Sequence, residues 1–302
     1  MKENTRQLTF SSSANKSPIY GYIWESSKNT EPLGVLQLVH GFAEHSRRYA
    51  AFARLMASKG FVVASHDHLG HGKSANGNFG FVANEGGHKF LAKDTHQFTN
   101  ILNSDYDLPL VLLGIGSGSL IARYVCGNFG KDYAAAILLG TSGKAAGMYF
   151  KIKEKLAEKD AVWLDKIWHK YNNRHFRKSV YGESWLTRSI PDVAAFEADP
   201  LCGFSLTYSA WRDILHLNKI VNSRAAFENM PKDLPMLLIS GLDDPMGSFG
   251  RGVIKVYERL VMNHSPFVDI KLYEECRHEL LFELNKDEIY DDILEWILKV
   301  LP

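Results

Sequence analysis

A glycine-rich turn follows the third apolar segment of the chain, in the run Leu-Leu-Gly-Ile-Gly-Ser-Gly-Ser. A strand, a sharp turn and a helix in this order form the setting of a nucleophile elbow, Gly-x-Ser-x-Gly, whose flanking glycines let the strand and helix pack closely. If Gly114 and Gly118 are these two glycines, the nucleophile position falls on Gly116. Because glycine has no hydroxyl group, no acyl-enzyme can form at this position.

Three other interpretations of this turn stay open. In the first, the register is shifted by one residue and Ser117 is a displaced nucleophile, but isoleucine, at position 115, fits a close-packed flanking position poorly. In the second, the run is a dinucleotide-binding fingerprint, G-x-G-x-x-G/A. That fingerprint belongs in the first strand–helix unit with an acid about 20 residues further on, and Asp132 comes too early. In the third, the turn has no chemical role.

Two further candidates follow the last two apolar segments. Asp243 and Asp244 follow LPMLLISG after one leucine, and His278 comes shortly after FVDIKLYE. A carboxylate at such a place can orient a catalytic histidine and stabilise its imidazolium form. Taken alone, an Asp-Asp-Pro turn is equally typical of a solvated loop, and an isolated histidine is more often a surface or core residue. The order elbow, acid, histidine, each after its own predicted strand, is the order of an α/β-hydrolase triad and favours the catalytic interpretation.

The first long apolar segment ends in His40-Gly41-Phe42. In a site of this kind, the backbone N–H after that strand and the N–H after the nucleophile form the oxyanion hole. We therefore expect Phe42 and Ser117 to supply the two donors. Backbone donors remain when the side chain of a serine is lost.

The run HDHLGHG places three histidines, His66, His68 and His71, close together in the sequence. A metal site built on them would need carboxylate or further histidine ligands and a second shell of hydrogen bonds. The glycines between them are more typical of a loop that turns beneath the site. We expect no metal ion and no cofactor.

Strands and helices that alternate along the chain must position these residues. Apolar segments that predict strands lie at 34–41, 61–67, 109–114, 134–140, 234–241 and 267–274, after an N-terminal pair, QLTF and IYGYIW. Helices are expected at 49–60, 89–103, 119–129 and 287–301, with a further helix between the segments 234–241 and 267–274. This alternation predicts an α/β protein with a mostly parallel sheet that is buried on both faces.

One stretch, residues 144–230, breaks the alternation, because it is helix-like, rich in Trp, Tyr and Lys, and has no clear strand. We expect it to be a helical cap inserted over the C-terminal edge of the sheet, where open α/β sheets bind ligands. The core then consists of residues 1–143 and 231–302.

The composition excludes several classes of protein. The chain is 45% hydrophobic and 23% charged with a formal net charge of +1, which gives no general attraction to nucleic acid or acidic membranes. Its three cysteines are scattered, which favours reduced thiols. The polar N-terminus predicts no signal peptide, and no apolar run reaches the ~20 residues of a membrane span. We expect a cytoplasmic protein whose partner is a small acyl substrate or ligand.

Long motifs along the chain resemble those of one known family. They are HGFAEHSRRY, HDHLGHGKS, LLGIGSGS, WLTR followed by DPLCGF, ISGLDDPMGSFG and RHELLFE. With these motifs the chain resembles the bacterial lysophospholipase and monoacylglycerol-lipase-like serine hydrolases, also classed as serine aminopeptidases of type S33. The likeness runs from IYGYIW to the last helix. It implies an α/β-hydrolase fold with a helical cap over an acyl pocket.

The resemblance also implies roles for individual residues. The family's oxyanion motif falls on His40, Gly41 and Phe42. Its acid falls on Asp244, because the family pattern G-x-x-D-P fixes the second aspartate, and its base falls on His278.

The elbow departs from the family pattern. The family usually has Gly-His-Ser-Met-Gly, whereas residues 114–118 here are Gly-Ile-Gly-Ser-Gly, so all three inner residues differ. Leu69 also stands where the family's D-H-x-G-H-G loop usually has a basic residue. Removal of a triad serine costs about 10⁶ in rate. The sequence therefore does not predict ordinary serine-type catalysis.

Three functions follow as hypotheses. The first is a carboxylic-ester hydrolase that uses Ser117 as a displaced nucleophile, or a water activated by His278 in the space at Gly116. The second is a catalytically silent hydrolase fold that binds an acyl or other hydrophobic small molecule. The third, by analogy of fold alone, is an interaction scaffold whose contact face is the tryptophans of the insertion, although these are also typical of packing inside a cap. These are Trp163, Trp168, Trp185 and Trp211.

Overall fold

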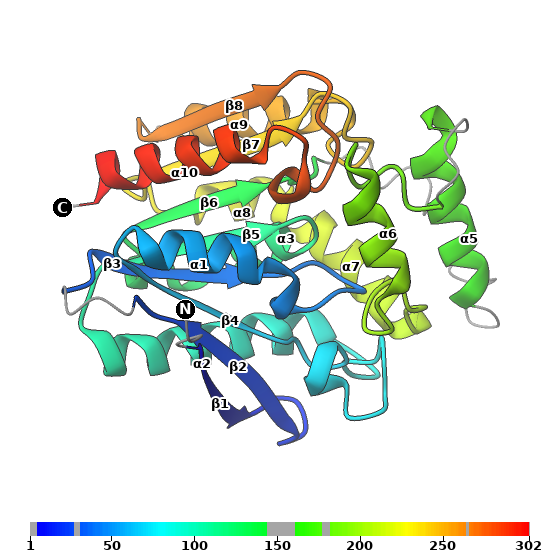
Figure 1. The fold of residues 1–302 in the computed structure, drawn as a ribbon, viewed down its shortest axis with the longest axis horizontal. Coiled ribbons are helices and arrows are strands. Elements are labelled where there is room, and N and C mark those ends of the chain that lie inside the picture. Colours follow the sequence, from blue (N-terminus) through cyan, green and yellow to red (C-terminus); the bar gives the residue numbers. More distant parts are fainter. Residues whose placement is uncertain (1–4, 27–30, 144–160, 177–181, 264–265, 302) are drawn as a thin grey trace.

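A single eight-stranded sheet forms the centre of the molecule (Figure 1). The computed structural model describes residues 5–26, 31–143, 161–176, 182–263 and 266–301. The strand order is β1-β2-β4-β3-β5-β6-β7-β8. The strands are β1 (Thr5–Ser11), β2 (Pro18–Trp24), β3 (Gly34–Val39), β4 (Phe61–His66), β5 (Leu110–Ile115), β6 (Ala135–Leu139), β7 (Met236–Gly241) and β8 (Val268–Tyr273). Strands β1 and β2 are antiparallel to their neighbours, and β3 to β8 are parallel. The predicted α/β class with a mostly parallel sheet is confirmed.

Burial along the strands explains why their sequences are continuous apolar runs. Every residue of β3, β4, β5, β6 and β7 is buried, as expected for parallel strands with helices on both faces. The edge strand β8 instead alternates between buried and exposed positions. The central strands therefore form a rigid base for the loops at their C-terminal ends.

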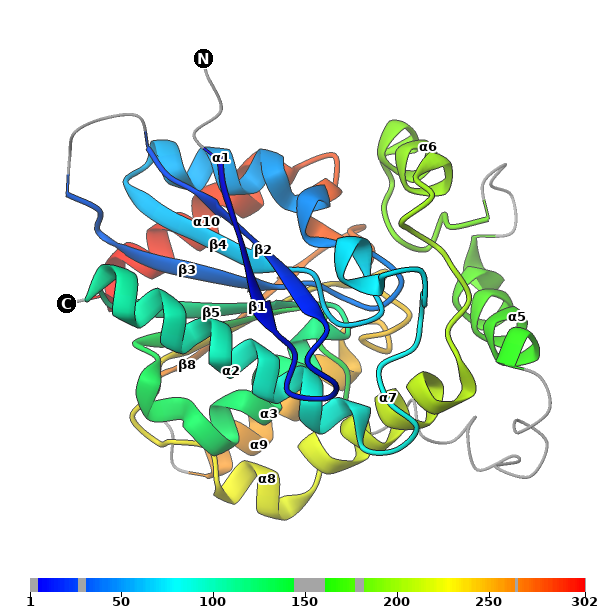
Figure 2. The ribbon, with the colours of Figure 1, turned by 90° about the horizontal axis from the view of Figure 1, so that it is seen from below.

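Two layers of helices cover the sheet (Figure 2). One face carries α1 (Ala50–Ser58) and α10 (Lys286–Val300), and the other carries α2 (Gly87–Tyr106), α3 (Gly118–Phe129) and α9 (Arg251–Met262). A separate hydrophobic cluster lies under each layer. Short 3-10 helices are η1 (Ser46–Tyr49), η2 (Gly72–Ala75), η3 (Gly130–Asp132), η5 (Asn173–His175) and η6 (Leu280–Phe282). The helices predicted from the sequence outside residues 144–230 correspond to α1, α2, α3, α9 and α10.

The described part of the stretch 144–230 contains the helices α5 (Ala161–Asn172), α6 (Ile190–Ala198), α7 (Tyr208–Val221) and α8 (Arg224–Glu228), joined by turns, and no strand. Figure 1 shows α5 and α6 beyond the C-terminal ends of the parallel strands. Helix α7 is different, because Leu217 and Val221 belong to the hydrophobic cluster that also contains α2 and α3 residues. The division into a core and a cap at 144–230 stays a prediction, and α7 connects the two parts.

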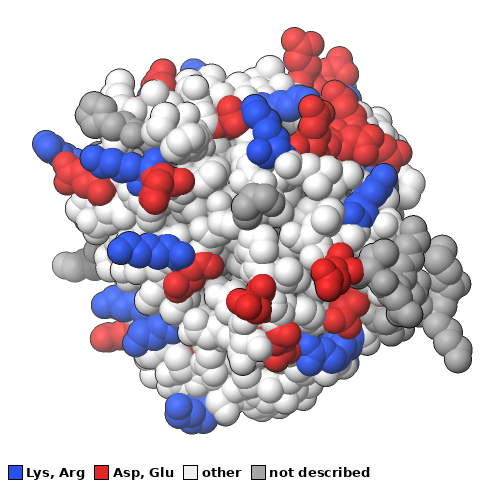
Figure 3. Space-filling model, turned by 90° about the vertical axis from the view of Figure 1, so that its left-hand side faces the viewer, with Lys and Arg blue, Asp and Glu red and all other residues white. Residues whose placement is uncertain are grey.

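Charges are mixed on the side of the molecule away from α5 and α6. On the face shown in Figure 3, acidic and basic side chains are interspersed among uncharged ones. This distribution accords with the formal net charge of +1. Among the described residues, no helix combines the length and the apolar character needed to cross a bilayer.

Candidate active site

The turn between β5 and α3 has the geometry of a nucleophile elbow. Gly116 adopts a φ of +54°, in the left-handed region that favours glycine, and its N–H donates to the Leu139 carbonyl at 2.9 Å. A Cβ on Gly114 would lie 2.6 Å from the Cα of Ser119, and one on Gly118 would lie 2.2 Å from the Val39 carbonyl oxygen. These contacts leave no room for side chains at 114 and 118. They place Gly116 at the apex of the turn.

Asp244 and His278 meet beside this turn. Asp244 follows β7, His278 follows β8, and His278 Nδ1 lies 3.0 Å from the Asp244 carboxylate. The second carboxylate oxygen of Asp244 accepts the Met246 N–H at 2.8 Å, and Asp244 is fully buried. Burial by itself would lower the pKa of His278, but the charge of Asp244 and its hydrogen bond outweigh burial and raise that pKa above its ordinary value.

The other ring nitrogen of His278 points at the apex of the elbow. A Cβ built on Gly116 would lie only 2.8 Å from His278 Nε2. In a working triad this nitrogen takes the proton of the serine hydroxyl. Here it faces a backbone that has no side chain, so the acid–base pair is assembled and has no hydroxyl partner at residue 116.

The backbone N–H groups after β3, where an oxyanion donor was predicted, donate to side chains of the protein itself. The Phe42 N–H, which follows β3, donates to the side-chain oxygen of Ser117 at 2.7 Å. The preceding N–H, of Gly41, donates to the Glu44 carboxylate. Among the described residues, no hydrogen bond joins Ser117 to His278. The Ser117 hydroxyl is therefore hydrogen-bonded to the loop after β3 and not to His278.

Sequence reasoning missed a buried ionic cluster next to His278. Arg48 donates two hydrogen bonds to Glu279, at 2.6 and 2.7 Å, and a third to Glu44, which also accepts from the Tyr49 hydroxyl at 2.7 Å. Burial raises the pKa of Glu279, and Arg48 opposes that rise. The motif HGFAEHSRRY contained Glu44 and Arg48, yet only its first three residues received a role. The partner, Glu279, follows His278 directly in the sequence and lies 231 positions from Arg48.

A cavity of about 1060 Å³, a volume that includes the part open to solvent, lies beside the elbow and His278. Its wall contains Gly116, Ser117 and His278, together with Glu44 and Glu279. The rest of the wall is largely apolar and comes from both the core and the α5–α7 region. Its apolar members include Ile115, Leu120, Trp168, Trp185, Leu186, Phe196, Phe204, Leu206, Trp211, Ile214, Leu215 and Met246. A largely apolar wall with a few polar groups is typical of a small-molecule site.

Three of the four tryptophans of the insertion face this cavity. Trp168, Trp185 and Trp211 line it, and the Trp185 ring lies 5.0 Å from that of His278. Trp163 is 39% exposed. The three inward-facing rings are placed to contact a bound small molecule.

The histidines of the HDHLGHG run are buried and packed together with His40. Ring-to-ring distances are 4.2 Å for His40–His68 and 4.9 Å for His66–His68. Burial lowers the pKa of each of these histidines, so they are neutral core residues at pH 7. In the described part of the chain they form no group with the donors of a metal site.

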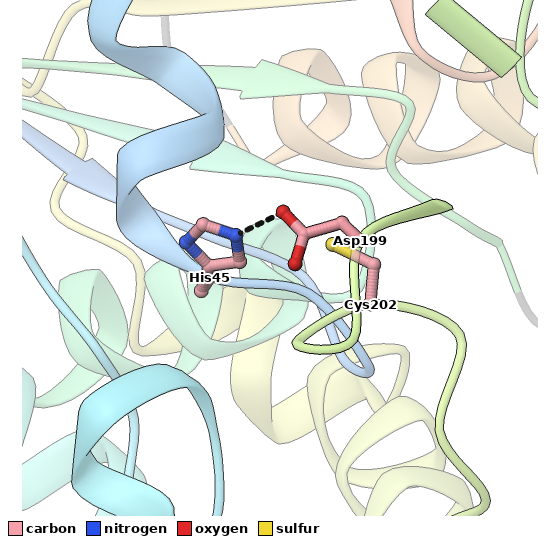
Figure 4. A group of neighbouring side chains, drawn as sticks. All are labelled: His45, Asp199 and Cys202. Carbon is pink, nitrogen blue, oxygen red and sulfur yellow. Dashed lines mark hydrogen bonds and ion pairs between the residues drawn. The ribbon is translucent and has the colours of Figure 1, made fainter. Parts of the chain in front are cut away.

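The one described group with potential metal donors is elsewhere, at His45, Asp199 and Cys202 (Figure 4). One oxygen of Asp199 lies 3.0 Å from His45 Nε2, and the other accepts the Leu201 N–H at 2.8 Å, so protein atoms already satisfy this carboxylate. Burial raises the pKa of the Cys202 thiol, which keeps the sulfur protonated. This donor set does not fit a metal ion well. The hydrogen bond between His45 and Asp199 joins the end of α6 to the loop after β3, beside the Gly203 N–H to Ala43 carbonyl bond of 2.9 Å.

Comparisons with known proteins agree with this geometry. The family model described as serine aminopeptidase, S33 matches residues 30–285. A monoacylglycerol lipase of Mycolicibacterium smegmatis is 26% identical over 290 residues, which cover 92% of each chain. The human monoglyceride lipase is also 26% identical, over 88% of this chain and 82% of its own length. Among solved structures, a thermostable carboxyl esterase from Bacillus coagulans in complex with glycerol superposes with a TM-score of 0.89 at 30% identity and covers 99% of both chains.

Proposed function

Because the chain belongs to the serine aminopeptidase S33 family and has the α/β-hydrolase fold of the monoacylglycerol-lipase-like type, we propose that it binds carboxylic esters with an acyl chain without hydrolysing them through a serine acyl-enzyme. One observation carries the second half of this proposal. Gly116 forms the apex of the elbow, and His278 Nε2 would lie 2.8 Å from a Cβ at that residue. The base is therefore aimed at a position that offers no hydroxyl.

The cavity supports the first half of the proposal. Its largely apolar wall can hold an acyl chain, and His278, Ser117 and Glu44 are among the polar groups that line it. The two buried glutamates share one counter-charge, because Arg48 pairs with both of them. We infer a ligand similar to a monoacylglycerol, by analogy with the lipases that the chain resembles.

The test combines ligand binding with active-site labelling. We expect 1-monolauroylglycerol to quench the fluorescence of the cavity tryptophans in a saturable way and to be recovered intact. A fluorophosphonate probe should leave the native protein unlabelled, whereas Gly116→Ser should gain labelling at residue 116 and ester hydrolysis at least about 10³-fold above native. Labelling of native protein at Ser117 would instead establish a displaced nucleophile and overturn the proposal.

A second candidate function is slow hydrolysis by an activated water. Its support is the complete Asp244–His278 pair, since a pure binder has no evident need for it. His278 would remove a proton from a water at the position beside Gly116, the hydroxide would attack the ester carbonyl, and the protonated His278 would return that proton to the departing alcohol. Residual hydrolysis that survives fluorophosphonate treatment and disappears in His278→Gln would support it.

A further inference from the structure

The Ser117 side chain occupies a place that a bound ester would need. In acyl-transfer sites, backbone N–H groups after the first strand and after the nucleophile hold the carbonyl oxygen as it gains negative charge. Here the Phe42 N–H already donates to Ser117 Oγ at 2.7 Å, at the short end of the normal range for an N–H···O hydrogen bond. The acceptor of the Phe42 N–H is thus an oxygen of the protein itself, Ser117 Oγ.

Backbone packing brings residue 117 next to the Phe42 N–H. The first turn of α3 is pressed against the end of β3, since a Cβ on Gly118 would lie 2.4 Å from the His40 carbonyl oxygen. Ser117 begins this turn with right-handed helical angles, and its Oγ lies 3.3 Å from the point that a Cβ on Gly41 would take. A short side chain that can accept a hydrogen bond at residue 117 is therefore held next to the Phe42 N–H.

Taking the ester ligand from the proposed function, we infer that the Ser117 hydroxyl fills the oxyanion hole as an internal substitute for the carbonyl oxygen of the ligand. Two separate features of the site then prevent ester hydrolysis. Residue 116 has no nucleophile, and residue 117 occupies a donor that would stabilise the developing charge. Ser117 is a blocking residue of the hole and not a displaced nucleophile.

The first test measures hydrolysis of p-nitrophenyl octanoate by four proteins: native, Gly116→Ser, Ser117→Ala and the double variant. Loss of one oxyanion donor costs about 10²–10³ in kcat. We therefore expect the double variant to exceed Gly116→Ser by about 10² in kcat with little change in KM, and Ser117→Ala alone to stay inactive. A double variant no faster than Gly116→Ser would overturn the inference, whereas hydrolysis by the native protein would contradict only the proposed function.

The second test avoids the strained Gly116→Ser backbone. Binding of 2-tridecanone, which has a ketone carbonyl and no ester bond, is followed by tryptophan fluorescence in native protein and in Ser117→Ala. Release of the Phe42 N–H should tighten binding of the ketone by roughly 3- to 10-fold and leave binding of tridecane, which has no carbonyl, unchanged. Ser58→Ala, at an exposed serine on α1, is the matched control. Unchanged or weaker binding of the ketone by Ser117→Ala would show that the hydroxyl helps to hold the ligand and would overturn the inference.

Discussion

The site has two halves, and they differ in how many of the groups of a serine-hydrolase triad they contain. The acid–base half, on the loops after β7 and β8, has Asp244 and His278 in hydrogen-bond contact at 3.0 Å. The elbow half, after β5, keeps the left-handed turn at Gly116 and has lost the hydroxyl there. The elbow conformation depends on close backbone packing at Gly114 and Gly118 and not on the nucleophile itself. The backbone of the elbow therefore keeps its form although residue 116 carries no hydroxyl group.

The largest expected effect tests whether the acid–base half still works. In the Gly116→Ser/Ser117→Ala background, His278→Gln should lower kcat for p-nitrophenyl octanoate by about 10⁴ or more, because the restored serine then has no base. The affinity for 2-tridecanone should change by less than about 2-fold, since a truncated triad leaves the apolar wall intact. If His278→Gln retains the gained hydrolysis, the acid–base half has also lost its role.

The same contrast explains what the sequence could and could not predict. Continuous apolar runs predicted the buried parallel strands, and Gly114 and Gly118 predicted the register of the elbow because only glycine fits such close contacts. The contact between Ser117 and Phe42 depends on a side-chain direction across 75 positions, which no local pattern encodes. Glu44 and Glu279 likewise come together only through Arg48 in the folded chain. The cap region was predicted as helical, but the packing of α7 on the core depends on tertiary contacts of Leu217 and Val221.

A second prediction concerns the buried cluster that supports the acid–base half. Arg48→Met should lower the free energy of unfolding by about 3–5 kcal/mol, because Glu44 and Glu279 then lie buried without a counter-charge. Urea denaturation at pH 7 measures this as a lower midpoint with an unchanged m-value. Arg6→Met is the matched control, since its pair with Asp105 is largely exposed and should contribute less than about 1 kcal/mol. Equal losses in the two variants would show that the cluster is as well solvated as a surface pair.

A third prediction concerns the elbow half and compares the cost in stability of a steric clash with the cost of a strained backbone. Gly118→Ala should cost about 3 kcal/mol or prevent folding, because its Cβ would meet backbone oxygens of β3 and His40 that cannot move independently. Gly116→Ala should cost only about 1–2 kcal/mol, since its φ is positive but its close neighbour is a side-chain ring.

Gly77→Ala provides the control for strain alone, because Gly77 has a φ of +85° and no atom lies within 4 Å of the point that its Cβ would take. Thermal and urea unfolding of the three variants should rank them Gly118→Ala, then Gly116→Ala, then Gly77→Ala, from most to least destabilised. A larger loss for Gly116→Ala than for Gly118→Ala would mean that the apex, and not its flanks, determines the turn.

The smallest expected effect is a pH dependence that reports the charge state of the acid–base half. His278 faces the carboxylates of Asp244, Glu279 and Glu44, and its pKa is raised in the folded protein. A raised pKa means that the folded state binds the proton more tightly than the unfolded state, so this contribution to stability is full below the ordinary pKa of about 6.5 and is lost as the pH rises through the folded value. His278→Gln has no titrating ring and lacks this contribution at every pH. The native protein's advantage in unfolding free energy over His278→Gln should therefore shrink as the pH rises above about 6.5. An advantage that grows with pH would mean that burial, and not Asp244, dominates at His278, and that the acid–base half has been altered as the elbow has.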